Sequence, residues 1–487
     1  MSKKAIIIGS GIAGLAAAVR LRAKGFAVEV FESNSYPGGK LSEIEIGGYR
    51  FDAGPSLFTL PEQIEELFRI CGREPKDHFD YIKLPVTCHY FWEDGKSLKA
   101  YADINLFAEE VELKLGEPAS HIRRALKKSD YIYKHLSPLF MHRSLHKWGT
   151  WTNPQALQSY LKMGKLGIFQ TMNAANEQNF NHPKLVQLFN RYATYNGSNP
   201  YQTPATLNII PHLEFNIGAF FPNKGMHDIT NSIFKLAKDI GVEFHFEAKV
   251  KEVVVEKGKA SGVLVNNEIH PADIIVNNMD MVNAYKTILQ KQKQPRKLLE
   301  QPKSSSALIF YWGIKKEFPE LDLHNILFSN DYKKEFDHIF NQGSVYEDPT
   351  VYINITSVCK RDDAPEGCMN WFTMINVPNN KGQDWDNLIQ MARKNIIKKI
   401  NRTLNTDIEP LIEVEEILEP RTIESKTSSA QGALYGNSSN NRYAAFLRHA
   451  NFSSNIKNLY FCGGSVHPGG GIPLCLLSAK IMTEMID

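Results

Sequence analysis

Cysteine is scarce in this sequence, and long apolar runs are missing. The six cysteines are scattered over 487 residues without a CxxC pair or a His/Cys ligand spacing. This pattern gives no sign of a metal site and favours free thiols in a reducing compartment over a disulfide framework. No apolar run reaches about 18 residues, so no membrane-spanning helix is expected.

The charge balance and the N-terminus further limit the class of protein to which the chain can belong. The net charge is only +3, from 56 basic and 53 acidic residues, and no nucleic-acid-binding motif accompanies it. The chain runs from Met1 directly into an apolar stretch, without a signal-peptide cleavage site. We therefore expect an intracellular globular protein of two or three lobes, without a nucleic-acid partner.

Residues 4–32 have the pattern of a β-α-β nucleotide-binding unit. A short apolar strand leads into GxGxxG, a helix rich in alanine follows, and a second strand ends in an acidic residue. In such a unit the glycines permit a tight turn, close approach of a pyrophosphate and close packing of helix on strand. The acidic residue accepts hydrogen bonds from the adenosine ribose. The residues expected at the dinucleotide are Gly9, Gly11, Ile12, Ala13, Gly14 and Glu32.

A second glycine pair decides which dinucleotide is expected. YPGGK, residues 36–40, is a simple loop when taken alone, but it follows Glu32 closely. There it resembles the second motif of FAD-binding oxidoreductases related to the amine oxidases, in which Gly-Gly-Arg contacts the cofactor phosphates. Lys40 replaces that arginine, which keeps the charge and loses the bidentate geometry. The resemblance implies FAD rather than NAD, with Gly38, Gly39 and Lys40 at the phosphates.

The segment YRFDAGPSLF, residues 49–58, resembles the part of the same flavoproteins that lies beside the isoalloxazine ring. A strand end followed by a turn is the alternative interpretation. The resemblance places Gly54, Pro55 and Ser56 at the cofactor. We expect Asp52 to orient loop backbone, because loop aspartates usually accept hydrogen bonds from nearby N–H groups.

The FAD-binding sequence occurs in three separate pieces. A helix is expected at 61–71, and a glycine turn with an amphipathic helix at 220–241. A hairpin is expected around the turn at 257–259. In the flavoproteins that the chain resembles, a strand at this point passes the adenine, and Val250 matches the residue whose backbone meets it. The expected domains are a discontinuous FAD-binding domain at 1–85, 221–285 and 415–487, and a substrate-binding and membrane-contact lobe at 86–220 and 286–414.

Two stretches of the expected lobe are basic. Residues 286–303 are basic with leucines between, and residues 121–151 mix seven basic residues with five aromatic ones. A protein surface exposed to solvent is one explanation for the basic residues of either stretch. Basic residues beside aromatic ones also suit the headgroup region of an anionic bilayer. The residues of the second stretch are Arg123, Arg124, Lys127, Lys128, Tyr131, Tyr133, Lys134, Phe140, Arg143, Lys147, Trp148 and Trp151.

From residue 4 onward the chain resembles the bacterial carotenoid desaturases of the phytoene desaturase type. The motifs are the N-terminal fingerprint, YPGGK, FDAGPS, APEGCMNWF at 364–372 and the late NLYFCGGSVHPGGGIP. HPGxGIP is the most specific, because unrelated flavoproteins lack it. GGSVHPGGGIPLCLLS and GALYGNSSNNRYAAFLR, at 432–448, look more like members that act on 1-hydroxycarotenoids at the 3,4 position.

The glycine-rich stretch near the C-terminus is expected to form the far wall of the FAD site. Related amine oxidases carry Gly-Asp where this chain has Gly463-Gly464, so backbone or Ser465 must replace the carboxylate contact to the ribityl chain. The helix that opens at Gly471-Ile472-Pro473 directs its positive end toward the flavin N1–C2 edge. The expected residues here are Gly463, Gly464, Ser465, Gly471, Ile472 and Pro473.

The resemblance implies an α/β fold, a Rossmann-type FAD-binding domain of the amine-oxidase-like superfamily with an inserted α+β lobe. It implies removal of two hydrogens from a polyene, with a hydride passing to flavin N5 and a proton leaving the neighbouring carbon. The cation is spread along the conjugated chain, so a strong base is not required and no catalytic residue is assigned. His467 is a candidate for a catalytic base, but a structural role is expected for it. Asp52 and Glu214 are weaker candidates for such a base.

Several alternatives stay open. A phytoene-type desaturase, a polyene isomerase or saturase, or an amine oxidase shares the fold. Two further alternatives belong to a different functional class, that of proteins without catalytic activity. They are an escort protein for lipid-modified partners and an interaction protein with a vestigial flavin. The expected partners are a carotenoid, an anionic membrane surface, and oxygen or a quinone as electron acceptor, because no second Rossmann fingerprint is present. The expected location is cytoplasmic, peripheral to the inner face of the cell membrane.

Overall fold

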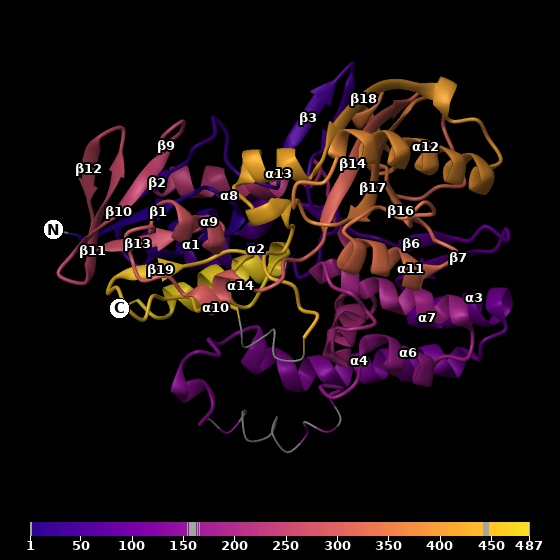
Figure 1. Ribbon diagram of the computed structural model, residues 1–487, viewed down its shortest axis with the longest axis horizontal. Coiled ribbons are helices and arrows are strands. Elements are labelled where there is room, and N and C mark those ends of the chain that lie inside the picture. Colours follow the sequence, from indigo (N-terminus) through magenta and orange to yellow (C-terminus); the bar gives the residue numbers. More distant parts are fainter. Residues whose placement is uncertain are drawn as a thin grey trace.

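The computed structural model describes residues 2–152, 154, 162, 164, 166–441 and 448–486 and shows two lobes side by side (Figure 1). One lobe is built on a five-stranded parallel sheet in the order β19-β13-β1-β2-β9. The expected β-α-β unit is its centre. The elements are β1 (Lys4–Ile8), α1 (Ile12–Ala23), β2 (Ala27–Phe31), β9 (Glu243–His245), β13 (Ile274–Asn277) and β19 (Leu459–Phe461).

Alanines allow α1 to pack tightly at the centre of this lobe. Ala16, Ala17 and Ala18 are fully buried, and α1 contacts both α8 (Asp228–Asp239) and α14 (Ile472–Thr483). Small side chains let helix axes approach closely, which places the starts of α1 and α14 near the same end of the sheet. Three distant parts of the sequence thus form one layer.

Hairpins and short helices complete the first lobe. The expected helix at 61–71 is α2 (Glu62–Ile70), and the expected hairpin at 257–259 joins β10 and β11. The other elements are β3 (Glu43–Ile46), β4 (Tyr49–Asp52), β5 (Tyr81–Lys83), β8 (Phe220–Pro222), β10 (Val250–Glu256), β11 (Lys259–Val265), β12 (Glu268–Pro271), α9 (Met281–Lys286), α10 (Arg296–Leu299) and α13 (Pro420–Thr427).

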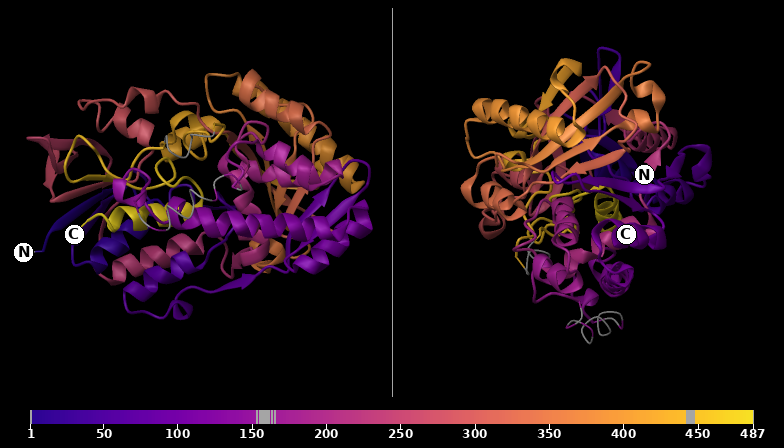
Figure 2. Two further views of the ribbon diagram at one scale, coloured as in Figure 1. Left: turned by 90° about the horizontal axis from the view of Figure 1, so that it is seen from below. Right: turned by 90° about the vertical axis from the view of Figure 1, so that its right-hand side faces the viewer.

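The second lobe contains a seven-stranded mixed sheet in the order β18-β14-β17-β16-β15-β6-β7. Helix α12 covers one face of it, where Trp312, Trp371 and Trp385 are buried in one apolar core (Figures 1 and 2). The strands are β6 (Val86–Phe91), β7 (Ser97–Tyr101), β14 (Ser306–Ile314), β15 (His324–Leu327), β16 (Val351–Asn354), β17 (Met369–Val377) and β18 (Ile412–Leu418), and α12 is Trp385–Leu404.

A group of helices lies beside this sheet, in the lower right of Figure 1. The long α4 contains the first part of the basic and aromatic stretch noted in the sequence, up to Phe140, and it packs on α3. The group comprises α3 (Ile104–Leu115), α4 (Ala119–Phe140), α6 (Met172–Asn179) and α7 (Pro183–Asn190), with α11 (Tyr332–Asp337) nearby in Figure 1. Among the described residues no helix is both long and apolar enough to cross a bilayer.

The strand pairing refines the expected domain boundaries. The expected boundary at 415 falls inside β18, and β18 pairs with β14 in the sheet of the second lobe. We therefore propose that the C-terminal piece of the FAD-binding domain begins after Leu418. The boundary at 86 coincides with the first residue of β6. The boundary expected at 286 falls too early, because Leu298 and Leu299 of α10 pack against a core of the first lobe.

Candidate active site

A cavity of about 1750 Å³ lies between the two lobes, with residues of both in its wall. Ligand pockets of ordinary size occupy about 300–1,000 Å³, so this one has room for more than one small ligand. All but one of the cofactor residues expected from the sequence line it. They are Gly9, Gly11, Ile12, Ala13, Glu32, Gly38, Gly39, Lys40, Gly54, Pro55, Ser56, Val250, Gly463, Gly464, Ser465, Gly471, Ile472 and Pro473.

The remaining residue, Gly14, lies behind this wall and has the packing role expected of it. A Cβ there would lie 2.1 Å from the Gly9 carbonyl oxygen and 2.7 Å from Nδ2 of Asn278. Gly9 itself has a φ of +93°, which an L side chain rarely adopts. The two glycines therefore shape the turn and hold α1 against the sheet, while Gly11 faces the cavity.

Helix α1 begins without a side-chain cap from the described residues. Its first N–H groups and the positive end of its dipole therefore meet the cavity at Gly11, Ile12 and Ala13. The N-terminus of such a helix is a ready binding position for a phosphate.

Glu32 stands at the end of β2, at the edge of the cavity. Its carboxylate accepts hydrogen bonds from Ser10 N at 2.8 Å, Ser10 Oγ at 2.9 Å and Asn34 N at 2.9 Å. Ser33 Oγ donates a fourth at 3.2 Å. Two of these donors are hydroxyls, which can rotate to another acceptor, so the carboxylate can still accept from a ribose hydroxyl.

The two glycine motifs touch each other. Gly38 N donates to Ser10 O at 2.9 Å, and a Cβ on Gly39 would lie 3.5 Å from Gly11 Cα. Lys40 follows, with its ammonium donating to the carbonyls of Leu434 at 2.8 Å and Ala433 at 3.3 Å.

Desolvation lowers the pKa of Lys40, and the charge of Asp280 opposes this shift in part. Asp280 was not expected from the sequence. It caps α9, accepting from Val282 N at 2.9 Å and Asn283 N at 3.3 Å, and it lines the cavity. The cavity therefore contains a cation that is bonded to neutral carbonyls and can also serve an anionic group.

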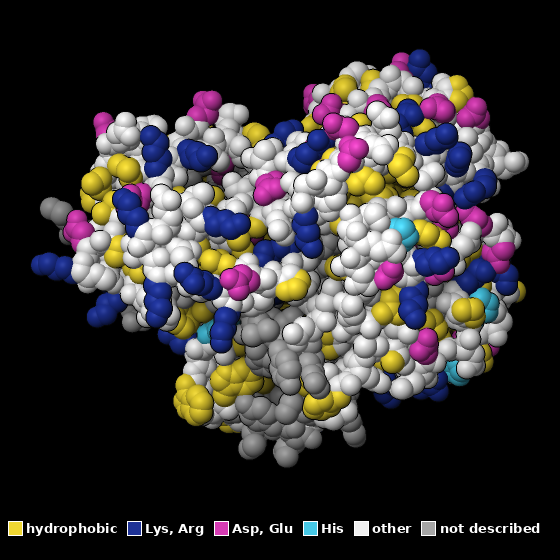
Figure 3. Space-filling view, viewed as in Figure 1, with side chains coloured by type: hydrophobic (Ala, Val, Ile, Leu, Met, Phe, Trp, Pro, Cys, Tyr) yellow, Lys and Arg dark blue, Asp and Glu magenta, His cyan; other side chains and the backbone are white. Residues whose placement is uncertain are grey.

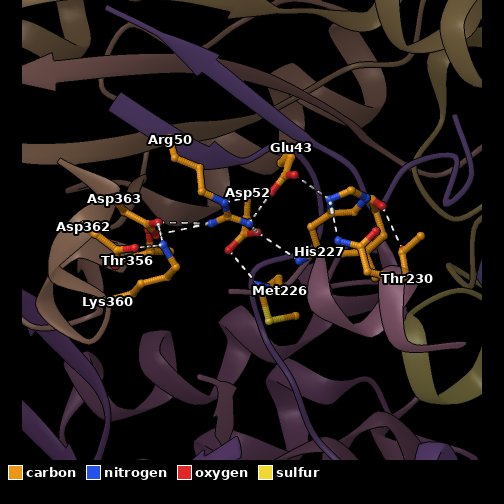
Figure 4. Close-up of polar contacts among 12 residues, drawn as sticks. Glu43, Arg50, Asp52, Met226, His227, Thr230, Thr356, Lys360, Asp362 and Asp363 are labelled. Carbon is orange, nitrogen blue, oxygen red and sulfur yellow. Dashed lines mark hydrogen bonds and ion pairs between the residues drawn. The ribbon is translucent and has the colours of Figure 1, made fainter. Parts of the chain in front are cut away.

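A network of charges lies directly before the loop at 53–56 (Figure 4). Arg50 contacts Asp52 at 2.8 Å, Glu43 at 2.7 Å and Asp363 at 3.3 Å. Asp52 accepts in turn from the backbone N–H groups of Met226 at 2.8 Å and His227 at 3.0 Å, at the start of α8. The expectation that Asp52 orients backbone is confirmed by these bonds, which tie β4 to α8.

The loop at 53–56 is held closely against the second glycine motif. A Cβ on Gly54 would lie 1.8 Å from the Lys40 carbonyl oxygen, so a larger residue would force the two loops apart. Ser56 Oγ lies 2.7 Å from the hydroxyl of Tyr352, a residue of the second lobe. The loop thus connects the glycine motifs with the sheet across the cavity.

The glycine-rich stretch near the C-terminus also lines the cavity. Gly463 has a φ of +110°, and a Cβ there would meet Oδ1 of Asn278 at 2.8 Å. Gly471 has a φ of +104°, and no described atom lies within 4 Å of the Cβ it lacks. Ser465 Oγ accepts from Met281 N at 2.9 Å, so this side chain fixes the start of α9.

These features together fit an elongated cofactor that contains a pyrophosphate. Helix α14, like α1, begins without a side-chain cap among the described residues, so two positive helix ends line one cavity. Open space in front of Gly471 admits a planar group, and Lys40 supplies a cation. The residues present therefore fit a flavin adenine dinucleotide.

The basic and acidic candidates from the sequence are already bonded. His467 is fully buried, its Nε2 lies 2.8 Å from the Arg143 carbonyl oxygen, and burial lowers its pKa to about 3. It is not among the cavity-lining residues, which agrees with a structural role. Glu214 lines the cavity, but Arg191 at 3.2 Å, Tyr192 at 3.1 Å and Tyr195 at 2.8 Å occupy its oxygens.

The structure adds polar residues of the second lobe that the sequence did not reveal. Besides Asp280, the cavity wall contains Arg191, Tyr195, Tyr311, His324 and Tyr352. They come from separate helices and strands and share no local motif. Of the desaturase-like segment at 432–448, residues 442–447 lie outside the described residues.

Comparison with known proteins gives the family. The model for flavin-containing amine oxidoreductases matches residues 12–484. The chain is 56% identical to 1-hydroxycarotenoid 3,4-desaturase of a Flavobacterium species, over 99% of both chains. It is 29% identical to phytoene desaturase of Fusarium fujikuroi, over 100% of this chain and 89% of that one.

A solved structure of putrescine oxidase aligns with a TM-score of 0.64, at 13% identity, over 100% of this chain and 99% of that chain. At this identity the likeness shows the fold alone, and it confirms the expected amine-oxidase-like α/β architecture. The chain therefore belongs to the flavin-containing amine oxidoreductases, within them to the carotenoid desaturases, and its cofactor is FAD.

Proposed function

We propose that the protein is a 1-hydroxycarotenoid 3,4-desaturase. The observation that carries this proposal is that one continuous cavity joins the glycine loops of one lobe to apolar side chains of the other. The 56% identical Flavobacterium protein has this activity in its name, and the likeness extends over 99% of both chains.

The FAD is proposed to lie along the expected cofactor residues. Glu32 and Val250 would meet the adenosine, and Gly11, Ile12, Ala13 and Lys40 the pyrophosphate. Gly54, Pro55, Ser56 and the stretch from Gly463 to Pro473 would meet the flavin and its ribityl chain. These assignments rest on the resemblance to FAD-binding oxidoreductases and on the presence of each residue in the cavity wall.

The remaining wall suits a long hydrocarbon. Near the end of α4 and in the helices after it, apolar side chains form a large part of the lining, beside a polar part that includes Arg191, Tyr195 and Glu214. An extended polyene is stabilised against the apolar part by about 25 cal/mol per Å² of apolar surface buried. The apolar residues are Leu136, Phe140, Met141, Ile168, Ile209, Ile210 and Leu213, with Leu474 from α14.

A bound flavin supplies the acceptor for a hydride. The residues of the chain hold the polyene against the loop at 53–56 and keep water away from it. Glu214 is committed to three donors, and His467 is not a lining residue. We therefore propose that no side chain serves as a dedicated base, because the positive charge left by hydride loss is spread over the conjugated chain.

Anaerobic mixing of the purified holoenzyme with a 1-hydroxycarotenoid tests the activity. The flavin absorbance should bleach, and the product should contain one further double bond at the 3,4 position. Bleaching by phytoene alone would assign the chain to the phytoene-type enzymes. A colourless protein that binds polyenes would support the escort class and refute the proposal.

We also propose that the lobe with α4 binds peripherally to the anionic inner face of the cell membrane. Trp148 is 81% exposed and Phe169 is 73% exposed, and Arg143 and Lys147 are exposed beside the tryptophan in sequence. Ile168, next to Phe169, lines the cavity. Apolar side chains gather at the lower edge of Figure 3, and a cavity that opens there would receive its substrate from lipid.

Flotation with vesicles that contain phosphatidylserine tests the docking. Wild type should float at low salt, and a variant with Trp148→Ala and Phe169→Ala should float several-fold less. Ile269→Ala removes a comparable side chain, 63% exposed, from β12 of the other lobe and serves as the matched control. Equal flotation of all three proteins would contradict the proposal.

The proposed electron acceptor is oxygen or a membrane quinone. The sequence contains one dinucleotide fingerprint, at 9–14, and the FAD occupies it in this proposal. Reoxidation of the bleached enzyme by a quinone in vesicles, by dissolved oxygen and by NAD⁺ compares the acceptors directly. Rapid reoxidation by NAD⁺ alone would show that the assignment is wrong.

A further inference from the structure

Three polar side chains form a hydrogen-bonded row in the cavity wall. Ser56 Oγ lies 2.7 Å from Tyr352 OH, and Tyr352 OH lies 2.7 Å from Nδ1 of His324. All three residues line the cavity, and they come from the loop after β4, from β16 and from β15. The row therefore crosses from the flavin-side loop to the sheet of the second lobe.

Asn354 fixes the direction of the hydrogen bonds in the row. It is paired with His324 across the two strands, and its Nδ2 donates to the Leu323 carbonyl at 3.0 Å. The same Nδ2 lies 3.2 Å from His324 Nδ1. An amide nitrogen can only donate, so Nδ1 is an acceptor whose single lone pair is shared by Asn354 Nδ2 and Tyr352 OH. The neutral ring then has its proton on Nε2, for which the described residues supply no acceptor.

The ring stays neutral throughout the physiological range. Burial lowers the pKa of His324 to about 3, and burial raises the pKa of the Tyr352 phenol. Tyr352 OH therefore donates to His324 Nδ1, and Ser56 OH donates to Tyr352. Ser56 Oγ is left with lone pairs for which the described residues supply no donor.

We propose that Ser56, with Tyr352 and His324 behind it, accepts a hydrogen bond from the 1-hydroxyl of the substrate and so selects hydroxylated polyenes. This inference rests on the proposed function and names the part of the cavity that distinguishes the substrate. An alcohol can donate the bond that Ser56 Oγ lacks, whereas an unsubstituted hydrocarbon end cannot.

The position of Ser56 agrees with the chemistry of such a substrate. Only C1 and C2 separate the hydroxyl oxygen from C3, so the oxygen lies at most about 4 Å from the carbon that reacts. A subsite for the hydroxyl must therefore lie immediately beside the hydride acceptor. Ser56 follows Gly54 and Pro55 in the loop expected at the isoalloxazine ring, and it shares the cavity wall with Gly471.

A second polar cluster of the wall, around Arg191 and Glu214, is already satisfied. Arg191 donates to Glu214 at 3.2 Å, to Tyr195 OH at 2.7 Å and to Tyr90 OH at 2.9 Å. Tyr192 and Tyr195 fill the remaining positions on Glu214. We assign this cluster to the rigidity of the wall, because a new ligand would have to displace one of these bonds.

The expected discrimination follows from the loss of one hydrogen bond. A hydrogen bond contributes about 0.5–1.5 kcal/mol net, and a hydrocarbon end also leaves the serine oxygen facing an apolar group. Ser56→Ala should therefore reduce the preference for the hydroxylated substrate about tenfold. Tyr352→Phe should reduce it less than Ser56→Ala, because the freed serine hydroxyl can then donate to the substrate oxygen.

The test compares a 1-hydroxycarotenoid with the same polyene lacking the hydroxyl. Two ratios are measured on each holoenzyme, that of kcat/KM values from flavin bleaching and that of Kd values from perturbation of the flavin spectrum. Tyr311→Phe is the matched control, because Tyr311 also lines the cavity and donates its hydroxyl to Ala53 O at 2.8 Å. Tyr311→Phe should change kcat/KM and Kd by the same factor for both substrates, so that both ratios stay the same.

The outcomes separate this inference from the proposed function. If Ser56→Ala weakens the binding of both polyenes equally, Ser56 does not recognise the hydroxyl, whether or not the enzyme is active on them. If wild type binds the hydroxylated polyene preferentially without bleaching, the subsite stands and the proposed function fails. If wild type shows no preference in either ratio, the subsite is refuted.

Discussion

Replacing Arg50 by Met removes the cation from the network in Figure 4 and keeps most of the side-chain volume. The arginine side chain is 11% exposed, and its partners Asp52 and Asp363 are 1% and 0% exposed. Removing one partner of a buried ion pair costs about 3–5 kcal/mol, because the other charge stays buried.

The structure places the expected loss at the lower end of this range. Asp363 keeps Lys360 at 2.7 Å, and Asp52 keeps the two backbone N–H groups at the start of α8. We expect the free energy of unfolding to fall by about 3 kcal/mol, roughly a hundredfold in the folding equilibrium. FAD should also dissociate more readily, because the network lies directly before the loop at 53–56.

The pH dependence adds a second signature. Burial raises the pKa of Asp363, and loss of Arg50 should raise it further. A raised pKa in the folded state means that stability is present at low pH and is lost as the pH rises through it. The deficit of the variant should therefore be smaller at pH 5 than at pH 8.

Urea unfolding of the holoprotein, followed by tryptophan and flavin fluorescence at both pH values, measures these effects. Arg361→Met is the control, since that side chain is 74% exposed and its pair with Glu317 at 3.3 Å should contribute less than about 1 kcal/mol. A deficit for Arg50→Met no larger than that of the control would refute the reasoning.

Two further predictions concern the cofactor and pH. Gly471→Asp should lose FAD and activity, because its carboxylate would enter the open space before α14. Gly471→Ala is the control that tests the backbone strain at φ +104° alone. Full flavin content in the aspartate variant, measured by absorbance, would contradict the placement of the flavin beside Gly471. Burial raises the pKa of Glu335 to about 7, so wild type should lose stability as the pH rises through 7. Glu335→Gln should flatten the melting temperature between pH 6 and pH 8, and an unchanged slope would show that Glu335 does not titrate there.

The parts of the site that depend on local backbone could be predicted from the sequence. Gly9, Gly14 and Gly54 are required by contacts of 2.1 Å or less, or by a positive φ, within short segments. Such requirements leave a fixed spacing of glycines that can be recognised without the fold. The capping role of Asp280 also has a local signal, because aspartate is favoured before the first turn of a helix.

The polar wall of the cavity could not be predicted in this way. Ser56 and Tyr352 are 296 positions apart, and Arg191 and Tyr90 are 101 apart. Each is an ordinary residue of its own segment, and the packing of a loop or helix on the sheet that contains β6, β15 and β16 brings them together. The boundary inside β18 has the same cause, because the partner strand β14 lies about a hundred residues earlier.

The order of strands in the five-stranded sheet has a consequence for synthesis. Its last strand, β19, pairs with β13, yet some 180 residues of the second lobe and its connections lie between them. At about 5–20 residues per second, the ribosome needs roughly 10–35 s to make that interval. During this time the edge of β13 is unpaired and the face of α1 that packs on α14 is uncovered. These surfaces are therefore uncovered during synthesis, and a complete flavin pocket exists only after α14 has emerged.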